Sequence, residues 1–214
     1  MVTARLVVAR QALHAVAELL LAGPQYRASG TIRLRVQPGG FATVAEPALR
    51  VEGAELVAGD RRLALQGATC TSLGDALGIE AGAPAGLYAE GSGADPTKVL
   101  SFDPAAAGLL LGRFAEGDTA LRLFAPDQQP VLWPEHFDLG ITVDEVNYGV
   151  SPGDAYSREP YAYVGPWTRR DGDFWNAPFG ATRPMSELAG ADAIAAFFAI
   201  GRDRARIDPP AKEA

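Results

Sequence analysis

Two strand-like runs separated by only two residues constrain the fold of this 214-residue chain more than any other feature. Residues 139–143 and 146–150 are short and rich in Val, Ile, Thr and Tyr, and Asp144-Glu145 lies between them. Because parallel strands need a long crossover, a connection this short predicts an antiparallel hairpin. The sequence Ser-Pro-Gly-Asp at residues 151–154 fits a tight turn, so the second strand is expected to end there.

Short strand-like runs separated by turns recur along the rest of the chain. In residues 32–36, Ile, Leu and Val alternate with two arginines, which predicts a half-buried strand ending at Gly39-Gly40. The other predicted strands are residues 49–52, 55–57, 63–65, 119–124, 131–133 and 161–164. Their short connections favour antiparallel pairing.

Helical patterns flank these strands. Asp103 fits an N-cap before Pro104, and Gly117 is expected to end the helix that begins there. Gly23-Pro24 is likewise expected to end the first helix. The predicted helices are residues 3–22, 71–79, 104–116 and 191–204, and the Gly-, Ala- and Pro-rich residues 81–96 are expected to form a loop.

The order of these elements predicts an α+β fold, with antiparallel sheets flanked by helices. Hydrophobic residues make up 48% of the chain and charged residues 21%, as in ordinary globular proteins. We expect a single integrated domain over residues 1–208, followed by a disordered tail at 209–214. Each half, about 1–100 and 101–208, runs from a helix into several strands, an order that permits two similar halves.

Composition excludes several classes of function. The net charge of −7 argues against nucleic-acid binding, which needs clustered cations. Cys70 is the only cysteine, so neither an intrachain disulfide nor a cysteine zinc site can form, and a reducing cytoplasm is the expected compartment. Arg10, His14 and Glu18 interrupt the apolar N-terminal run and line one helix face, which predicts a surface-exposed His14 and no membrane segment.

Catalytic and cofactor motifs are sparse. In a strand, His136 and Asp138 would point to the same side, and a His-x-Asp pair can begin an iron site, but the second histidine that such a site needs would have to be His14. No metal is therefore expected. The sequence has no G-x-S-x-G, Walker A or dinucleotide-binding motif, and no cofactor is expected. General acid–base catalysis by His136 with Asp138 or Glu135, of a hydrolase or isomerase type, is the alternative function.

Aromatic residues concentrate in the second half. Ten of the eighteen lie between residues 133 and 179, where they predict either a packed core or a pocket or interface. The sequence therefore favours small-molecule binding or protein interaction, with a homo-oligomer as one form of the latter. The candidate ligand-binding residues are Trp133, Glu135, His136, Asn147, Tyr148, Tyr163 and Trp167. Gly149 is expected to leave room for a backbone or ligand to approach.

Several short motifs resemble a bacterial family known only as a domain of unknown function. They are a Trp-x-x-x-Phe-Asp-Leu strand at residues 133–139, a Gly-x-x-x-Gly turn at 149–153 and a Pro-Tyr-x-Tyr strand at 160–163, ahead of a C-terminal helix. Val150 departs from the family pattern, which has an aromatic after the glycine. The family has no assigned activity, so the resemblance implies one integrated domain and a bacterial source but no catalytic residues.

Overall fold

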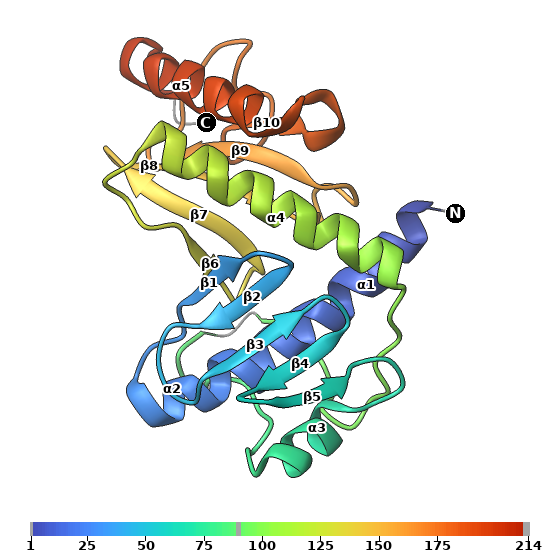
Figure 1. Cartoon of the computed structure of the whole chain (residues 1–214). Helices are drawn as coiled ribbons and strands as arrows, with labels where there is room; N and C mark the ends of the chain where they lie inside the picture. The colour runs from blue at the N-terminus through green and yellow to red at the C-terminus, as the bar shows by residue number, and fades with distance from the viewer. Residues whose placement is uncertain (1, 89–90, 212–214) are drawn as a thin grey trace. The chain divides into compact units, whose positions relative to one another are not determined.

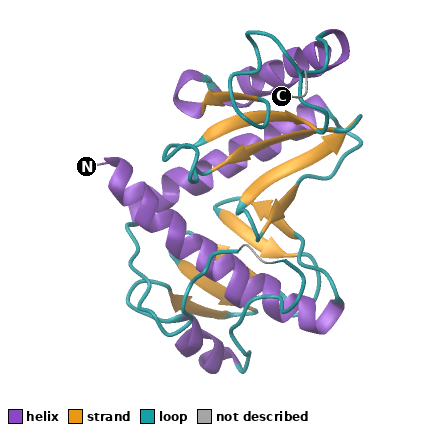
Figure 2. Ribbon diagram, turned by 180° about the vertical axis from the view of Figure 1, so that it is seen from behind, coloured by secondary structure: helices purple, strands orange, loops and turns teal. Residues whose placement is uncertain are grey.

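The structure, a computed structural model, describes residues 2–88 and 91–211. It confirms the α+β prediction of antiparallel strands flanked by helices (Figures 1 and 2). The chain divides into two compact units. Unit 1 comprises Met1–Ala115 and Val131–Asp138, and unit 2 comprises Glu116–Pro130 and Leu139–Ala214. The prediction of one integrated domain over residues 1–208 stays a prediction.

Six strands form the sheet of unit 1, in the order β6-β1-β2-β3-β4-β5. Neighbouring strands pair antiparallel. Short connections predict this for every pair except β1 and β6, which lie far apart in the sequence. Strand β2 was not predicted, because Gly40 weakens its sequence pattern. A Cβ atom at Gly40 would lie 1.8 Å from the carbonyl oxygen of Val51, so the close pairing requires glycine. The strands are β1 (Leu34–Gln37), β2 (Gly40–Thr43), β3 (Leu49–Glu52), β4 (Glu55–Ala58), β5 (Arg61–Ala64) and β6 (Val131–Trp133).

The N-terminal helical segment is longer than predicted. It runs as α1 (Val2–Val16), the π-helix η1 (Ala17–Ala22) and α2 (Gly23–Ser29), so Gly23-Pro24 does not end it. Pro24 lies in the first turn of α2, where a missing N–H costs little. The residues Ala4–Ser29 are long and apolar enough to cross a membrane by length and composition, and 72% of the most apolar window is buried in the structure.

Packing decides where helix α4 (Pro104–Phe124) ends. Asp103 caps it as predicted, because its carboxylate accepts hydrogen bonds from the N–H groups of Ala105 and Ala106, both at 3.0 Å. The prediction that the helix ends at Gly117 and that residues 119–124 form a strand is wrong. A Cβ atom at Gly117 would lie 2.3 Å from Val150 Cγ2, so this glycine allows close contact between helix and sheet.

Unit 2 contains strands in the order β10-β9-β8-β7. The predicted hairpin is confirmed, and its central residues Asp144 and Glu145 have φ values of 53° and 60°, as a type I′ turn requires. Strand β10 was not predicted. The elements are β7 (Asp138–Val143, its first residue in unit 1), β8 (Val146–Ser151), β9 (Tyr161–Pro166), β10 (Ala181–Pro184), η2 (Met185–Glu187) and α5 (Gly190–Ile207).

Helices α4 and α5 cover one face of the unit 2 sheet. Tyr148 on β8 packs against Phe124 of α4 and Phe198 of α5, with ring centroids 4.6 and 6.0 Å away. Residues 209–211 continue beyond α5 and are held to the segment after β9, where Asp171 N–H donates to the Pro209 carbonyl at 3.0 Å. Residues 212–214 of the predicted disordered tail lie outside the described residues.

In unit 1, helix α3 (Cys70–Leu77) follows the capping residue Thr69. Thr69 accepts a hydrogen bond from Ser72 N–H, and the Ser72 hydroxyl lies 3.0 Å from Thr69 N, which completes a capping box. The predicted helix at residues 71–79 is therefore present, shifted by one or two residues.

Candidate functional site

The residues predicted to bind or catalyse divide between the two units. Unit 1 contains Trp133, Glu135, His136 and Asp138, and unit 2 contains Asn147, Tyr148, Tyr163 and Trp167.

His136 and Asp138 do not share a strand. His136 is exposed in the turn at residues 134–137, whereas Asp138 is the first residue of β7. Phe137, between them, has a φ of 53° and directs its buried ring into the core of unit 1, where it packs on Phe114 at 5.2 Å. The expectation that His136 and Asp138 point to the same side of one strand was wrong, because His136 lies in the turn that precedes β7.

His14 is not a surface residue, contrary to the sequence-based expectation. Its Nε2 lies 2.7 Å from the carbonyl oxygen of Pro134, and its ring stacks on Phe137 with centroids 5.3 Å apart. Burial lowers the pKa of His14, although the hydrogen bond to Pro134 acts in the opposite direction. The imidazole is therefore neutral, and its Nε2–H donates to the Pro134 carbonyl, which holds the turn at residues 134–137 in place.

Glu18 is also buried, with 3% of its surface exposed. Its carboxylate accepts hydrogen bonds from the Tyr88 hydroxyl at 2.9 Å, from Ser92 N–H at 2.8 Å and from the Ser92 hydroxyl. A Cβ atom at Gly91 would lie 2.0 Å from Glu18 Oε1, so glycine permits the loop to approach the carboxylate. Burial, with the negative charge of Glu18, raises the pKa of Tyr88. The polar face of the N-terminal helix thus anchors a loop.

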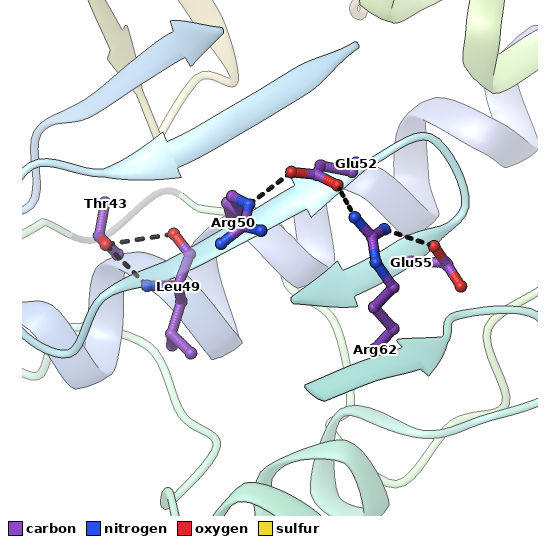
Figure 3. Close-up of polar contacts among 6 residues, drawn as sticks. All are labelled: Thr43, Leu49, Arg50, Glu52, Glu55 and Arg62. Atoms are coloured by element: carbon purple, nitrogen blue, oxygen red, sulfur yellow. Dashed lines mark hydrogen bonds and ion pairs between the residues drawn. The ribbon is translucent and has the colours of Figure 1, made fainter. Parts of the chain in front are cut away.

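Charged side chains on the sheet of unit 1 also pair with one another. Arg62 on β5 contacts Glu52 at 2.6 Å and Glu55 at 2.8 Å, and Arg50 contacts Glu52 at 2.5 Å (Figure 3). The hydrogen bonds from Arg50 and Arg62 lower the pKa of Glu52. These exposed pairs explain the charges without a ligand.

On the face of the unit 2 sheet opposite Tyr148, the candidate residues contact one another. The side-chain oxygen of Asn147 accepts hydrogen bonds from the Thr142 hydroxyl at 2.7 Å and from Trp167 Nε1 at 3.3 Å. The Tyr163 side chain lies across Gly149, because a Cβ atom there would be 2.5 Å from the Tyr163 hydroxyl oxygen. The space that Gly149 leaves is therefore filled by a neighbouring side chain.

Three aromatic side chains of unit 2 are unusually exposed. Trp167 exposes 66% of its surface, Tyr156 45% and Phe179 39%. Tyr156 and Phe179 pack edge to face with centroids 5.1 Å apart, and Tyr161 lies 5.7 Å from Tyr156. We call Tyr156, Phe179 and Trp167 the exposed aromatic residues below.

On the other face, the buried Tyr148 lines a cavity of about 220 Å³ in unit 2. The cavity brings together the β7–β8 turn, β8, the segment after β9, and α5. Its lining residues are Asp144, Glu145, Val146, Tyr148, Pro166, Thr168, Arg170, Arg202, Ala205 and Arg206. Three arginines in one small cavity are unexpected in a chain with a net charge of −7.

Three residues of this lining each bury a polar atom that has no hydrogen-bond partner among residues 2–88 and 91–211. These atoms are the Tyr148 hydroxyl, Arg170 Nε and Arg202 Nε. Each comes from a different element, namely β8, the segment after β9 and α5. Burial raises the pKa of Tyr148 to about 12, so its hydroxyl stays protonated at neutral pH. All three atoms can therefore donate a hydrogen bond.

The positions of the arginines are fixed by packing and pairing. The Arg202 guanidinium carbon lies 5.0 Å from the centroid of the Phe124 ring, in a cation–π contact. The backbone of Arg170 forms a β-bridge with Pro210. Arg206 pairs with the exposed Asp144 at 3.0 Å. The lining therefore contains the Arg206–Asp144 pair, the carboxylate of Glu145, and two cations, Arg170 and Arg202, without an ion pair in the described part of the chain.

Tyr148 was identified from the sequence, whereas the arginines were not. Arg202 and Arg206 are four residues apart and share a face of α5, but the predicted helix ended at residue 204 and left Arg206 outside it. Within the described residues, no group of three or more His, Cys, Asp and Glu side chains could hold a metal ion.

Comparisons with protein-family models, with curated proteins and with solved structures find no match. The resemblance to a bacterial family therefore stays a prediction, and the functional argument rests on the site itself.

Proposed function

We propose that this protein binds a small molecule in the cavity beside Tyr148, and that unit 2 is its binding unit. One observation carries the proposal: three residues that line one cavity, each from a different element, each bury a donor atom that lacks a partner among the described residues. A buried donor without an acceptor costs about 1–3 kcal/mol. A bound ligand with suitable acceptors would remove this cost, which is why the arrangement favours binding.

The alternative of catalysis by His136 receives less support. His136 is exposed in a turn, whereas Asp138 is the first residue of the following strand, β7. The two residues therefore do not share a strand that would align their side chains. A general base gains from a carboxylate that orients its imidazole. The alternative stays a prediction.

Protein interaction is a second candidate function, because the exposed aromatic residues favour it. Aromatic side chains at this level of exposure are typical of contact surfaces. A homo-oligomer that uses them would show a molar mass that rises with protein concentration, and Trp167→Ala would reduce that rise.

A thermal-shift screen of the full chain against small metabolites tests the binding proposal. A compound that binds the native state raises the melting temperature by mass action. We expect at least one compound to raise it in the wild type, and we expect Tyr148→Phe to reduce that shift. Tyr156→Phe is the matched control, because Tyr156 is a half-exposed tyrosine of the same unit. Equal shifts in both variants, or no shift with any compound, would contradict the proposal.

A further inference from the structure

We infer that the cavity beside Tyr148 binds a phosphate-type oxyanion, either inorganic phosphate or the phosphate group of a small metabolite. This inference rests on the proposed binding function and names the chemical class of the ligand. The kind, placement and charge of the residues in the lining support it.

The unpartnered groups can all act as donors. Arginine has five N–H donors and no acceptor, and it remains charged at every physiological pH. Tyr148 can donate its hydroxyl hydrogen. A ligand that pairs with Tyr148, Arg170 and Arg202 together must therefore present several acceptors, and a cation would be repelled by the guanidinium groups.

The placement of the donors on separate elements favours a tetrahedral ion over a planar one. They come from strand β8, from the segment after β9 and from helix α5, so no single side chain supplies them all. A carboxylate presents two oxygens in a single plane, which suits one bidentate arginine. A phosphate group presents oxygens in several directions and can accept from three separate elements at once.

The charge around the cavity also favours an anion, because the lining carries three arginines and only two carboxylates, Asp144 and Glu145. Three other arginines of unit 2 have carboxylate partners: Arg122 contacts Asp118 at 2.8 Å, Arg204 contacts Asp208 at 3.6 Å and Arg206 contacts Asp144 at 3.0 Å. The remaining ones, Arg158, Arg169 and Arg183, are exposed to solvent, whereas Arg170 and Arg202 are half-buried.

Arg170 and Arg202 have no such ion pair in the described part of the chain, although the chain carries more acidic than basic residues. An oxyanion would supply the missing counter-charge.

The size of the cavity limits the rest of the ligand. At about 220 Å³ it lies below the roughly 300–1,000 Å³ of pockets that enclose drug-sized molecules. A phosphate group with a short organic remainder fits this volume, whereas a nucleotide would have to extend past Arg206 and Asp144, which are both exposed.

Isothermal titration calorimetry of the full chain tests the inference, with sodium chloride holding the ionic strength constant. The probes are inorganic phosphate, glycerol phosphate, sulfate and acetate. We expect one-to-one binding of inorganic phosphate or glycerol phosphate, at least about tenfold tighter than acetate. Sulfate, which is tetrahedral and doubly charged, is expected to bind more tightly than acetate. If glycerol phosphate binds more tightly than inorganic phosphate, the ligand is a phosphorylated metabolite, and the reverse order assigns the free ion.

Variants locate the site. Arg202→Gln and Arg170→Gln are each expected to weaken phosphate binding by about tenfold or more, and Tyr148→Phe by about threefold to tenfold. Arg122→Gln is the matched control, because it removes an exposed, paired arginine of the same unit, and it should leave the affinity unchanged. Arg202→Lys, which keeps the charge but loses the Nε donor, should lie between Arg202→Gln and the wild type.

The outcomes separate this inference from the proposed function. Acetate binding as tightly as phosphate, or phosphate affinity unchanged in all three cavity variants, would overturn the oxyanion inference. If a neutral compound binds and Tyr148→Phe removes its binding, the proposed function stands and the oxyanion inference fails. If neither the four anions nor any compound of the thermal-shift screen binds, both fail. Unchanged melting temperatures in the ligand-free variants would show that lost binding is not caused by unfolding.

Discussion

A buried polar side chain of unit 1 and one of unit 2 differ in whether they have hydrogen-bond partners inside the protein. In unit 1 the side-chain amide of Gln25 is completely buried and fully paired. It donates to the carbonyl oxygens of Thr31 and Arg33, both at 2.9 Å, and accepts from the N–H groups of Val44 at 2.6 Å and Ala45 at 2.9 Å. Gln25 thus joins helix α2 to two loops, and its side-chain donors and acceptor are all paired within the protein.

In unit 2 the Tyr148 hydroxyl is as deeply buried, yet it has no partner among the described residues, and neither do Arg170 Nε and Arg202 Nε. Unit 1 has an exception of its own, because Glu135 Oε2 is buried without a partner in the same part of the chain. Polar groups that pair within the protein stabilise the fold, whereas unpaired donors on residues that line one cavity support the proposal of a ligand.

The largest effect is expected from Gln25→Ala. The change leaves the two carbonyl and two N–H groups that pair with Gln25 without their partner, and we expect a loss of about 3–5 kcal/mol in the free energy of unfolding. Urea denaturation measures it. Gln11→Ala, at an exposed position of α1, is the control and should change the free energy by less than about 0.5 kcal/mol. A loss below about 1 kcal/mol for Gln25→Ala would contradict the claim that the paired side chain of Gln25 stabilises the fold.

Glu18→Gln should have the next largest effect. The amide keeps the shape of the carboxylate but turns an N–H₂ group toward donors from Tyr88 or Ser92, so we expect a loss of about 2 kcal/mol. Denaturation by urea again reports the change. Glu80→Gln removes an exposed charge and serves as the control. Equal stability of the two variants would mean that Glu18 does not anchor the loop.

Two tyrosine variants compare a hydroxyl that is paired with one that has no partner in the described residues. Tyr88→Phe removes a hydroxyl that donates to Glu18, so a loss of about 1–2 kcal/mol is expected. Tyr148→Phe removes a buried hydroxyl without a partner in the described residues, so the ligand-free protein should keep its stability or gain up to about 1 kcal/mol. Thermal unfolding of both variants without added ligand gives the answer. A clear loss in Tyr148→Phe would assign that hydroxyl a structural role.

The smallest effect on stability is expected from Cys70, whose thiol is buried. A thiol forms only weak hydrogen bonds, so burying it costs little free energy. Burial raises the pKa of Cys70 to about 11, so its contribution to stability is full below the unfolded pKa of about 8.5 and is lost as the pH rises through 11. At pH 8 we expect alkylation by iodoacetamide to be at least about 100-fold slower in the native protein than in urea. Similar rates in both conditions would show that the thiol is accessible.

Local patterns predicted the elements whose structure is local. The β7–β8 hairpin was predicted because a two-residue connection permits one pairing only, and the start of α4 because Asp103 can cap a helix without help from the rest of the chain. The strand predicted at residues 119–124 was wrong because Gly117 does not end the helix but allows its close contact with Val150, which no local pattern shows.

The candidate site was predicted less well, for the same reason. Tyr148 was identified from its strand, but the absence of a partner for Arg170 or Arg202 in the described residues depends on which tertiary neighbours surround it. His14 was expected at the surface because its helix neighbours are charged, whereas the turn at residues 134–137 covers it. Whether a polar residue is exposed, satisfied or available to a ligand is decided by the folded chain.

The most direct test of the oxyanion site is an NMR titration of the arginine side-chain Nε–H signals with inorganic phosphate. Arg→Lys variants assign the signals of Arg170, Arg202 and the control Arg122. If phosphate binds in the cavity, the Arg170 and Arg202 signals shift and saturate together, while that of Arg122 stays in place. Signals of Arg170 and Arg202 that do not move, or that move no more than that of Arg122, would contradict the site.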